Sequence, residues 1–362
     1  MSDKGSSDKR KPTMRDVCKL AGVSTMTVSR VLGDPEKVSP ETRLKVLRAI
    51  EQIGYVPDQN AGSLSSSKSH FVALILPTLT NSNFGDTAEG LTEILGRAGY
   101  QPLIGYSRYS LDQEEAVIRA MLARRPDAIV VAGAEHTKST TLMLHQSGVP
   151  VIEIWDRPHQ PIDISVGYSN EEAGRLAARH LISLGHRKIA ALGASESGQG
   201  RDFRGEQRLS GFAAALLEAG LSDELVICEG DIPVSFTHGA KAMRQLLQHA
   251  PDVEAVFAVS DLSAVGAVME CHRAGIRVPE QISIMGFGNF EVGRQCVPSL
   301  TTISIDAQLI GRRTGQILLD LLDTKTPASL QRPAVIDLGF ELLIRGSTAA
   351  RVRRNEENQD NG

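Results

Sequence analysis

The segment 13–32 constrains the fold of this chain more than any other stretch. It contains two short amphipathic segments, and each begins with a residue that can cap a helix. Thr13, with Asp16 three residues later, has the spacing of a capping box, and Ser24 can cap the second segment. Gly22 between them can adopt the backbone angles that end a helix sharply. The pattern predicts a helix-turn-helix, whose second helix fits the major groove of DNA.

A third helix is predicted to follow, with Ser39 as its cap, Pro40 at its first position and Gly54 at its end. The apolar residues expected to face one another in the core are Val17, Leu20, Ala21, Val28, Val31, Leu32, Leu44, Leu47, Ile50 and Ile53. A small three-helix bundle that never contacts DNA is the alternative interpretation of these residues.

The distribution of charge favours DNA. The first fifty residues hold 11 Lys and Arg against 6 Asp and Glu, a net charge of +5. The whole chain carries −4, so the remainder carries −9. A basic head on an acidic body is typical of a phosphate-facing module joined to a part that avoids DNA.

Composition and length set wider bounds. A chain of 362 residues is expected to form two or three domains. No apolar run approaches the roughly 20 residues that span a membrane, and the polar start of the chain is not a signal peptide. Four scattered cysteines without a Cys-x-x-Cys pair predict neither a zinc site nor a disulfide framework. We therefore expect a cytoplasmic protein with no metal and no cofactor.

Along the chain we expect a disordered start (1–12), the helical head (13–57), a linker (58–69) and a disordered tail (346–362). The linker could form a short helix, although Gly62 and several serines weaken it. The tail has no leucine heptads, which argues against a tetramer-forming coiled coil.

From Phe71 onward, short apolar runs alternate with amphipathic segments in two successive series. This texture is typical of parallel sheets covered on both faces by helices. It predicts an α/β core of two doubly wound lobes with a ligand cleft between them. The expected strands are 71–76, 102–106, 127–132, 149–155, 188–192, 225–228, 255–259 and 282–287, and the expected helices lie near 84–98, 112–124, 170–184, 205–220, 238–249 and 261–273.

The order of these motifs resembles one family closely. The matching residues are Asp16-Val17, 21–24, 27–32, His180-Leu181, 184–189, 208–212, Ser260-Asp261, Val278-Pro279, 282–287 and 300–303. Over nearly its whole length the chain resembles the lactose-repressor/galactose-repressor family of transcriptional regulators. Within that family, 151–158 and 337–340 resemble the gluconate-utilisation repressors. The resemblance implies an all-α helix-turn-helix head and a periplasmic-binding-protein-like, two-lobed core.

The resemblance assigns roles on the second helix of the head. Thr25, Met26 and Arg30 fall where the family contacts base edges, and Arg30 can bind guanine with both ends of its guanidinium. Thr27 and Ser29 are candidates for contacts to phosphate or the minor groove.

In the linker, the resemblance makes Asn60 another candidate for such contacts. It places Leu64 at the family's wedge position, where one leucine from each subunit opens a central base step. Without the resemblance, Leu64 would be an incidental apolar residue. Because Gly62 raises the entropy lost on ordering, folding of this hinge should depend on DNA.

The resemblance also places Arg208 in the cleft as the main polar clamp, since a guanidinium suits hydroxyl pairs or a carboxylate. A surface arginine at the start of a helix is the alternative. Asn83 and Phe84 follow the first strand of the body, where one end of a ligand would lie. Trp155, the single tryptophan, is equally compatible with a cleft wall and with ordinary core.

One departure from the family concerns the ligand. Many sugar-binding members carry an aspartate where this chain has Gly288, followed by the neutral amide of Asn289. Ser260 likewise stands where a larger polar residue is common. A buried carboxylate would repel an anion, so its loss favours a sugar acid over a neutral sugar. The expected effector is gluconate or a related aldonic or keto-aldonic acid, bound with Asn83, Phe84, Trp155, Arg208, Ser260 and Asn289.

Taken together, the sequence predicts a repressor that binds a near-palindromic operator as a homodimer, with its DNA affinity controlled by the sugar acid. The effector domain is expected at 70–345, with one lobe at about 70–166 and 303–330 and the other at about 167–302 and 331–345. The alternatives are a solute-binding protein, which would need a signal peptide, and a sugar-metabolising enzyme with a regulatory head. The enzyme would need a catalytic constellation, which the cleft residues do not suggest.

Overall fold

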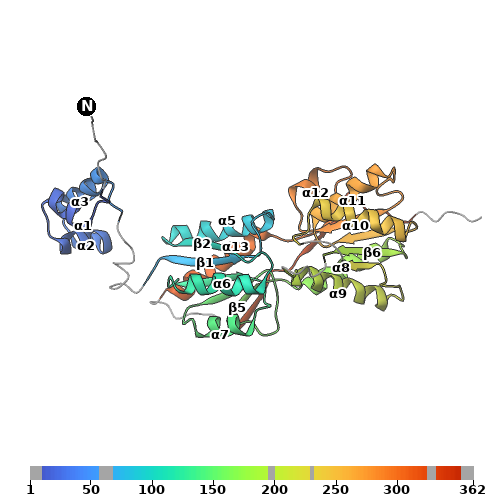
Figure 1. Cartoon of the computed structure of the whole chain (residues 1–362), viewed down its shortest axis with the longest axis horizontal. Coiled ribbons are helices and arrows are strands. Elements are labelled where there is room, and N and C mark those ends of the chain that lie inside the picture. The colour runs from blue at the N-terminus through green and yellow to red at the C-terminus, as the bar shows by residue number, and fades with distance from the viewer. Residues whose placement is uncertain (1–9, 57–67, 195–199, 229–231, 324–331, 352–362) are drawn as a thin grey trace, which may run out of the picture. The chain divides into compact units, whose positions relative to one another are not determined.

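The computed structural model describes residues 10–56, 68–194, 200–228, 232–323 and 332–351 (Figure 1). The chain forms two compact units, Met1–Ser69 and His70–Gly362. Among the described residues, no helix combines the length and the apolar character that crossing a bilayer requires.

The first unit contains the helices α1 (Met14–Ala21), α2 (Thr25–Gly33) and α3 (Pro40–Ile53), with a short 3₁₀ turn at Pro35–Lys37. The predicted start and stop signals are confirmed. Asp16 accepts hydrogen bonds from the backbone N–H and hydroxyl of Thr13, and the side chain of Ser24 caps α2. Gly22 ends α1 with a φ of 66°. The two helices are therefore held at a tight turn, as a helix-turn-helix requires.

The predicted core of this unit needs correction. Leu44 and Leu47 are 50% and 48% exposed, Leu20 is 45% exposed and Leu32 is 37% exposed. On α3 the buried residues are instead Val46 and Ala49. Two apolar stripes run along α3, and the smaller residues let α1 and α3 approach closely, so the stripe that contains the bulkier leucines faces outward.

The second unit contains two sheets of six strands each (Figure 1). The first sheet has the order β11-β5-β4-β3-β1-β2, and all its pairs are parallel. Its strands are β1 (Phe71–Leu76), β2 (Gln101–Tyr106), β3 (Ala128–Ala132), β4 (Val151–Ile154), β5 (Ile164–Gly167) and β11 (Ala334–Asp337). The helices of this lobe are α5 (Ser82–Arg97), α6 (Leu111–Leu122), α7 (Lys138–Gln146) and α13 (Ala307–Leu322).

The second sheet has the order β12-β10-β9-β8-β6-β7, and only β12 is antiparallel to its neighbour. Its strands are β6 (Ile189–Gly193), β7 (Val226–Cys228), β8 (Ala255–Ala258), β9 (Ser283–Phe287), β10 (Thr301–Ser304) and β12 (Glu341–Leu343). The helices of this lobe are α8 (Asn170–Ser183), α9 (Phe203–Glu218), α10 (Phe236–His249), α11 (Asp261–Arg273) and α12 (Glu291–Gln295).

The central strands are buried on both faces, as their continuous apolar runs predict. Along β1, Val72, Leu74 and Leu76 belong to one hydrophobic cluster, while Ala73 and Ile75 belong to another. Because side chains alternate along a strand, each sheet separates two layers of helices. This arrangement places the carboxyl ends of the strands where a ligand cleft is expected.

The predicted lobe boundaries need correction near the C-terminus. Residues 331–345 were expected in the second lobe, yet β11 pairs with β5 of the first sheet. Residues 303–304, expected in the first lobe, belong to β10 of the second sheet. Alternation alone could not reveal these exchanges, because short strands that complete two sheets carry the same local pattern in either one.

The predicted disordered tail starts too early. Ser347 is fully buried, and its hydroxyl accepts a hydrogen bond from the backbone N–H of Thr301 at 2.8 Å. Arg351 forms an ion pair with Glu254 at 2.6 Å. Residues 346–351 therefore belong to the second lobe, and only the part of the tail from 352 onward lies outside the described residues.

Glycine allows the helices α8 and α9 of the second lobe to pack closely. A Cβ on Gly211 of α9 would lie 2.0 Å from the carbonyl oxygen of Glu171 on α8. Gly211→Ala is therefore expected to destabilise the protein by about 1–3 kcal/mol, because the two backbones must separate. Thermal unfolding should show a lower Tm, whereas Gly96→Ala, in an open helical position, should keep or raise it. An unchanged Tm for Gly211→Ala would show that α8 and α9 separate freely.

Candidate functional site

The exposed face of α2 brings together most of the predicted DNA contacts. Val28 and Val31 are buried against the other helices. Thr25, Met26, Ser29 and Arg30 are all exposed, and Met26 is 67% exposed. Positions one turn apart lie on the same side of a helix. The four side chains therefore form one continuous outward surface.

Thr27 differs from these neighbours. It is partly buried, its N–H donates to the side chain of Ser24, and the two hydroxyls lie 2.9 Å apart. Thr27 thus contributes to the cap of α2, and a phosphate contact remains a prediction for it. Asn60 and Leu64 lie outside the described residues.

Among the charged side chains of the head, Arg30 is the one of interest for DNA binding. Three acidic side chains of the head form ion pairs, between Lys37 and Asp34, Arg43 and Glu36, and Lys45 and Glu41. Within the described part of the chain, the guanidinium of Arg30 forms no ion pair. An exposed, unpaired arginine in the middle of this surface is suited to contact DNA.

The second unit contains a cavity that residues of both lobes line. First-lobe residues come from the start of α5 and from the ends of β2, β4 and β5. Second-lobe residues come mainly from α9 and from the ends of β8 and β9. The lining consists of Asn81, Asn83, Phe84, Tyr109, Trp155, Tyr168, Asp202, Arg204, Arg208, Val234, Val259, Ser260, Phe287 and Phe290.

Arg208 lines this cavity, and its role as the polar clamp of a ligand stays a prediction. Its side chain is buried, donates to Asn170 Oδ1 at 2.5 Å and lies 4.1 Å above the ring of Phe287. Asp202 lies 3.9 Å from its terminal nitrogen. Desolvation lowers the pKa of Arg208, and the nearby carboxylate of Asp202 opposes that shift. The surface-arginine alternative is wrong.

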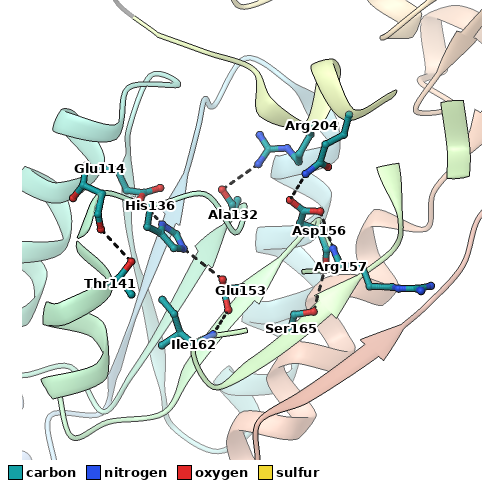
Figure 2. A network of polar contacts seen from close by, with 12 residues as sticks. Glu114, Ala132, His136, Thr141, Glu153, Asp156, Arg157, Ile162, Ser165 and Arg204 are labelled. Carbon is teal, nitrogen blue, oxygen red and sulfur yellow. Dashed lines mark hydrogen bonds and ion pairs between the residues drawn. The ribbon is translucent and has the colours of Figure 1, made fainter. Parts of the chain in front are cut away.

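A second arginine, Arg204, joins the two lobes beside the cavity. It donates to the carbonyl of Ala132 in the first lobe at 3.1 Å (Figure 2). Its guanidinium lies 5.5 Å from the ring centre of Phe84. Asp156 of the first lobe accepts a hydrogen bond from Gln207 of α9 at 3.3 Å. The lobes are therefore linked by polar contacts at the cavity, so a ligand that displaces or strengthens them would change the lobe arrangement.

Trp155 is both cavity wall and core. It is 4% exposed, lines the cavity and donates through Nε1 to Thr87 at 3.1 Å. Its φ of 69° is unusual for a bulky residue. Its backbone carbonyl accepts from Asn170, which also holds Arg208. The tryptophan and the clamp arginine are thus positioned by one shared side chain.

Asn83 and Ser260 line the cavity as predicted, but each also has a structural partner. Asn83 donates to the carbonyl of Gly288 at 3.1 Å, which joins the two lobes. The hydroxyl of Ser260 accepts from Leu262 and caps α11. Their remaining hydrogen-bonding capacity is what a ligand could use.

Asn289 does not line the cavity. Its amide donates to Ser304 at 3.1 Å and accepts from Arg345 at 2.6 Å, so its side chain faces an open groove instead. Gly288 before it has a φ of 119°, and a Cβ there would lie 2.7 Å from the ring of Phe290. Because Phe290 fills this space, the loop can carry no carboxylate into the cavity from position 288.

Sequence reasoning missed Tyr109, Tyr168, Asp202, Arg204, Phe287 and Phe290. Arg204 had a signal, because it precedes Arg208 by four residues and so shares its helix face. Another missed group is the carboxylate of Asp261, which accepts from Thr302 and from the N–H of Phe290. Burial raises the pKa of Asp261 to about 6, against the effect of these hydrogen bonds. It fixes the loop that holds Gly288.

A buried charge network lies in the first lobe (Figure 2). His136 contacts Glu114 at 2.6 Å and Glu153 at 3.6 Å, and all three side chains are nearly inaccessible. Burial alone would lower the pKa of His136. The two carboxylates outweigh burial and raise its pKa to about 9.

This network predicts a pH dependence of stability. A pKa raised from 6.5 to about 9 contributes stability that is complete below pH 6.5 and is lost as the pH rises through 9. The Tm should therefore fall between pH 6.5 and 9, and His136→Gln should flatten that fall. His145→Gln, at an exposed position on α7, is the matched control. Equal pH slopes for the wild type and His136→Gln would contradict a protonated, buried His136.

The two units thus define a class of protein, a helix-turn-helix module joined to a two-lobed ligand-binding body. Residues 13–58 match the model of bacterial regulatory proteins of the lacI family, and residues 178–348 match a periplasmic binding protein-like domain.

Individual relatives agree along nearly the whole chain. The HTH-type transcriptional regulator GntR of Pseudomonas aeruginosa is 37% identical over 96% of this chain and 98% of its own length. A crystal structure of a LacI-family transcriptional regulator from Silicibacter pomeroyi is 31% identical over 94% of this chain and 100% of that one, with a TM-score of 0.86. The lac repressor dimer bound to operator and the anti-inducer ONPF is 25% identical over 94% of this chain and 100% of that one, with a TM-score of 0.79.

The chain belongs to the lacI family of bacterial regulatory proteins. It is a DNA-binding transcriptional regulator with a ligand-binding body, and it is not an enzyme. The predicted fold class, an all-α head and an α/β two-lobed core, is confirmed.

Proposed function

We propose that this regulator is a repressor of sugar-acid utilisation whose operator affinity is set by gluconate or a close aldonic or keto-aldonic relative. The observation that carries the proposal is the charge of the cavity. Arg204 and Arg208 face a single lining carboxylate, Asp202. Because Gly288 brings no second carboxylate, the cavity has an excess of positive charge, which favours an anionic ligand.

The chemical groups of the lining support a polyhydroxylated acid as the ligand. Tyr109, Ser260 and Asn81 offer hydroxyl and amide groups, while Phe84 and Trp155 offer apolar faces. Sugars combine hydroxyl groups with apolar C–H faces, so polar and aromatic walls together suit them. The cavity's position between the lobes also links its occupancy to their arrangement.

Control of DNA binding would follow from that link. A ligand that binds one lobe arrangement more tightly shifts the lobes toward it. If that arrangement separates the first lobes of a dimer, the two heads no longer fit both half-sites at once and operator affinity falls. A coupling free energy of about 1–3 kcal/mol is typical of such control.

We further propose a homodimer on a near-palindromic operator. β2 is an edge strand of the first sheet, and its Leu103, Ile104 and Tyr106 are 39%, 43% and 43% exposed. Exposed apolar residues on an edge favour association. Two heads related by two-fold symmetry would then read two half-sites.

Calorimetry tests the effector directly. The purified protein is titrated with D-gluconate, its keto and phosphorylated relatives, and neutral D-glucose. Binding heat with at least one sugar acid and none with glucose is expected, and that acid should alter binding to promoter DNA in a gel-shift assay. Heat with glucose and none with any sugar acid would reject the proposal.

A further inference from the structure

Two residues that line the cavity each carry a buried polar atom without a hydrogen-bond partner. The atoms are Tyr168 Oη and Arg208 Nε, and among the described residues only five side chains carry such atoms. The other three, His136, His186 and Thr314, do not line the cavity. An unsatisfied buried polar group is costly. Two on residues that line one cavity, which are 0% and 6% exposed, indicate a place where a ligand supplies the partner.

Both groups are held rigidly around one ring. The guanidinium of Arg208 lies 4.1 Å from the ring centre of Phe287, and the ring of Tyr168 lies 6.0 Å from it. Tyr168 is also fixed by edge contacts to Trp155 at 6.0 Å and Phe340 at 6.2 Å. Asn170 fixes the other end of Arg208. Donors held in this way lose little freedom when a ligand binds.

Resting on the proposed sugar-acid function, we propose that Tyr168 and Arg208 form the subsite for the effector's carboxylate. The phenol O–H and the Nε–H each donate to that carboxylate. Tyr168 is then the residue that distinguishes the acid from the neutral polyol of the same length, and no feature of the sequence had assigned it a role.

The chemistry of the phenol supports this assignment. Burial raises the pKa of Tyr168, although the nearby guanidinium groups oppose the shift, so its hydroxyl stays protonated and can donate. A hydrogen bond to a charged acceptor is roughly twice as strong as one to a neutral acceptor. Phenylalanine at this position would keep the contacts with Trp155 and Phe340 and lack only the donor.

The test is calorimetric titration of the full chain with D-gluconate and, separately, D-glucitol, which lacks the carboxylate. Tyr168→Phe should weaken gluconate binding on the order of 10- to 100-fold. Its effect on glucitol should be less than threefold. Tyr100→Phe removes a phenol from a buried ring outside the cavity and should change neither affinity. The unliganded Tm of Tyr168→Phe should equal or exceed that of the wild type, because an unsatisfied hydroxyl is removed.

A second variant, Arg208→Lys, keeps the charge and removes the Nε–H, and it should also weaken gluconate binding at least tenfold. Wild-type gluconate affinity in Tyr168→Phe would overturn the subsite while leaving the proposed function intact. Equal losses for gluconate and glucitol would overturn its assignment to the carboxylate. A wild-type protein that binds no sugar acid would overturn both proposals.

Discussion

Replacing Arg208 by glutamine is expected to weaken sugar-acid binding on the order of 100-fold or more. Glutamine still offers Asn170 a polar partner, but it removes the cation that gives the cavity its excess positive charge. Half-maximal release of promoter DNA should then need a correspondingly higher concentration of effector. Calorimetry measures the first effect, and fluorescence anisotropy of labelled promoter DNA measures the second.

Arg179→Gln is the matched control, because Arg179 is an exposed arginine on the neighbouring helix α8. It should bind the sugar acid as the wild type does. An Arg208→Gln protein that remains folded and binds gluconate with wild-type affinity would show that the effector lies elsewhere.

Replacing Arg30 by alanine is expected to reduce specific binding to the operator by about 1–3 kcal/mol for each head. A dimer carries two heads, so the whole loss should be about 2–6 kcal/mol. The reason is that Arg30 is exposed and unpaired among the described residues, in the middle of the α2 surface. Competition between operator and unrelated DNA measures the effect as a loss of discrimination.

Arg48→Ala separates charge from recognition, because Arg48 is an exposed cation on α3. Removing it should weaken operator and unrelated DNA alike, and the ratio of the two affinities should stay the same. If Arg30→Ala and Arg48→Ala lowered that ratio equally, Arg30 would act only through its charge.

Much of the fold could be predicted from local signals in the sequence. Caps at Thr13, Ser24 and Ser39, with the left-handed glycines Gly22 and Gly54, set the helices of the head within a residue or two. These features act through neighbouring backbone groups, so they can be recognised without knowing the rest of the molecule. Continuous apolar runs likewise marked the central strands.

The predictions that were wrong concern features that long-range packing decides. The choice between the two stripes of α3 is decided by how closely α1 approaches Val46 and Ala49. The exchange of β11 into the first sheet is decided by pairing with β5, far away in the sequence. Residues 346–351 are likewise held in place by the hydrogen bond that the backbone N–H of Thr301 donates to Ser347. No local pattern contains these partners.

For the cavity, the residues expected at the cleft include Arg208, Asn83, Phe84 and Ser260, and all four line it. Trp155, which the sequence left open between wall and core, is both. The resemblance placed Asn289 wrongly at the cavity, because the side-chain amide of Asn289 forms hydrogen bonds with Arg345 and Ser304 instead. Tyr168 went unnoticed, since an aromatic residue after a buried strand is ordinarily core. Only the structure reveals that its hydroxyl is buried without a partner.

The most direct test of the account is the salt dependence of promoter binding, measured by fluorescence anisotropy. The full chain should bind its promoter with an affinity that falls steeply as salt rises, and gluconate should shift the curve. The same protein without residues 1–69 should bind sugar acid and no longer bind DNA. Binding that does not depend on salt, or that persists after the head is removed, would contradict control of a basic head by a ligand cavity in the second unit.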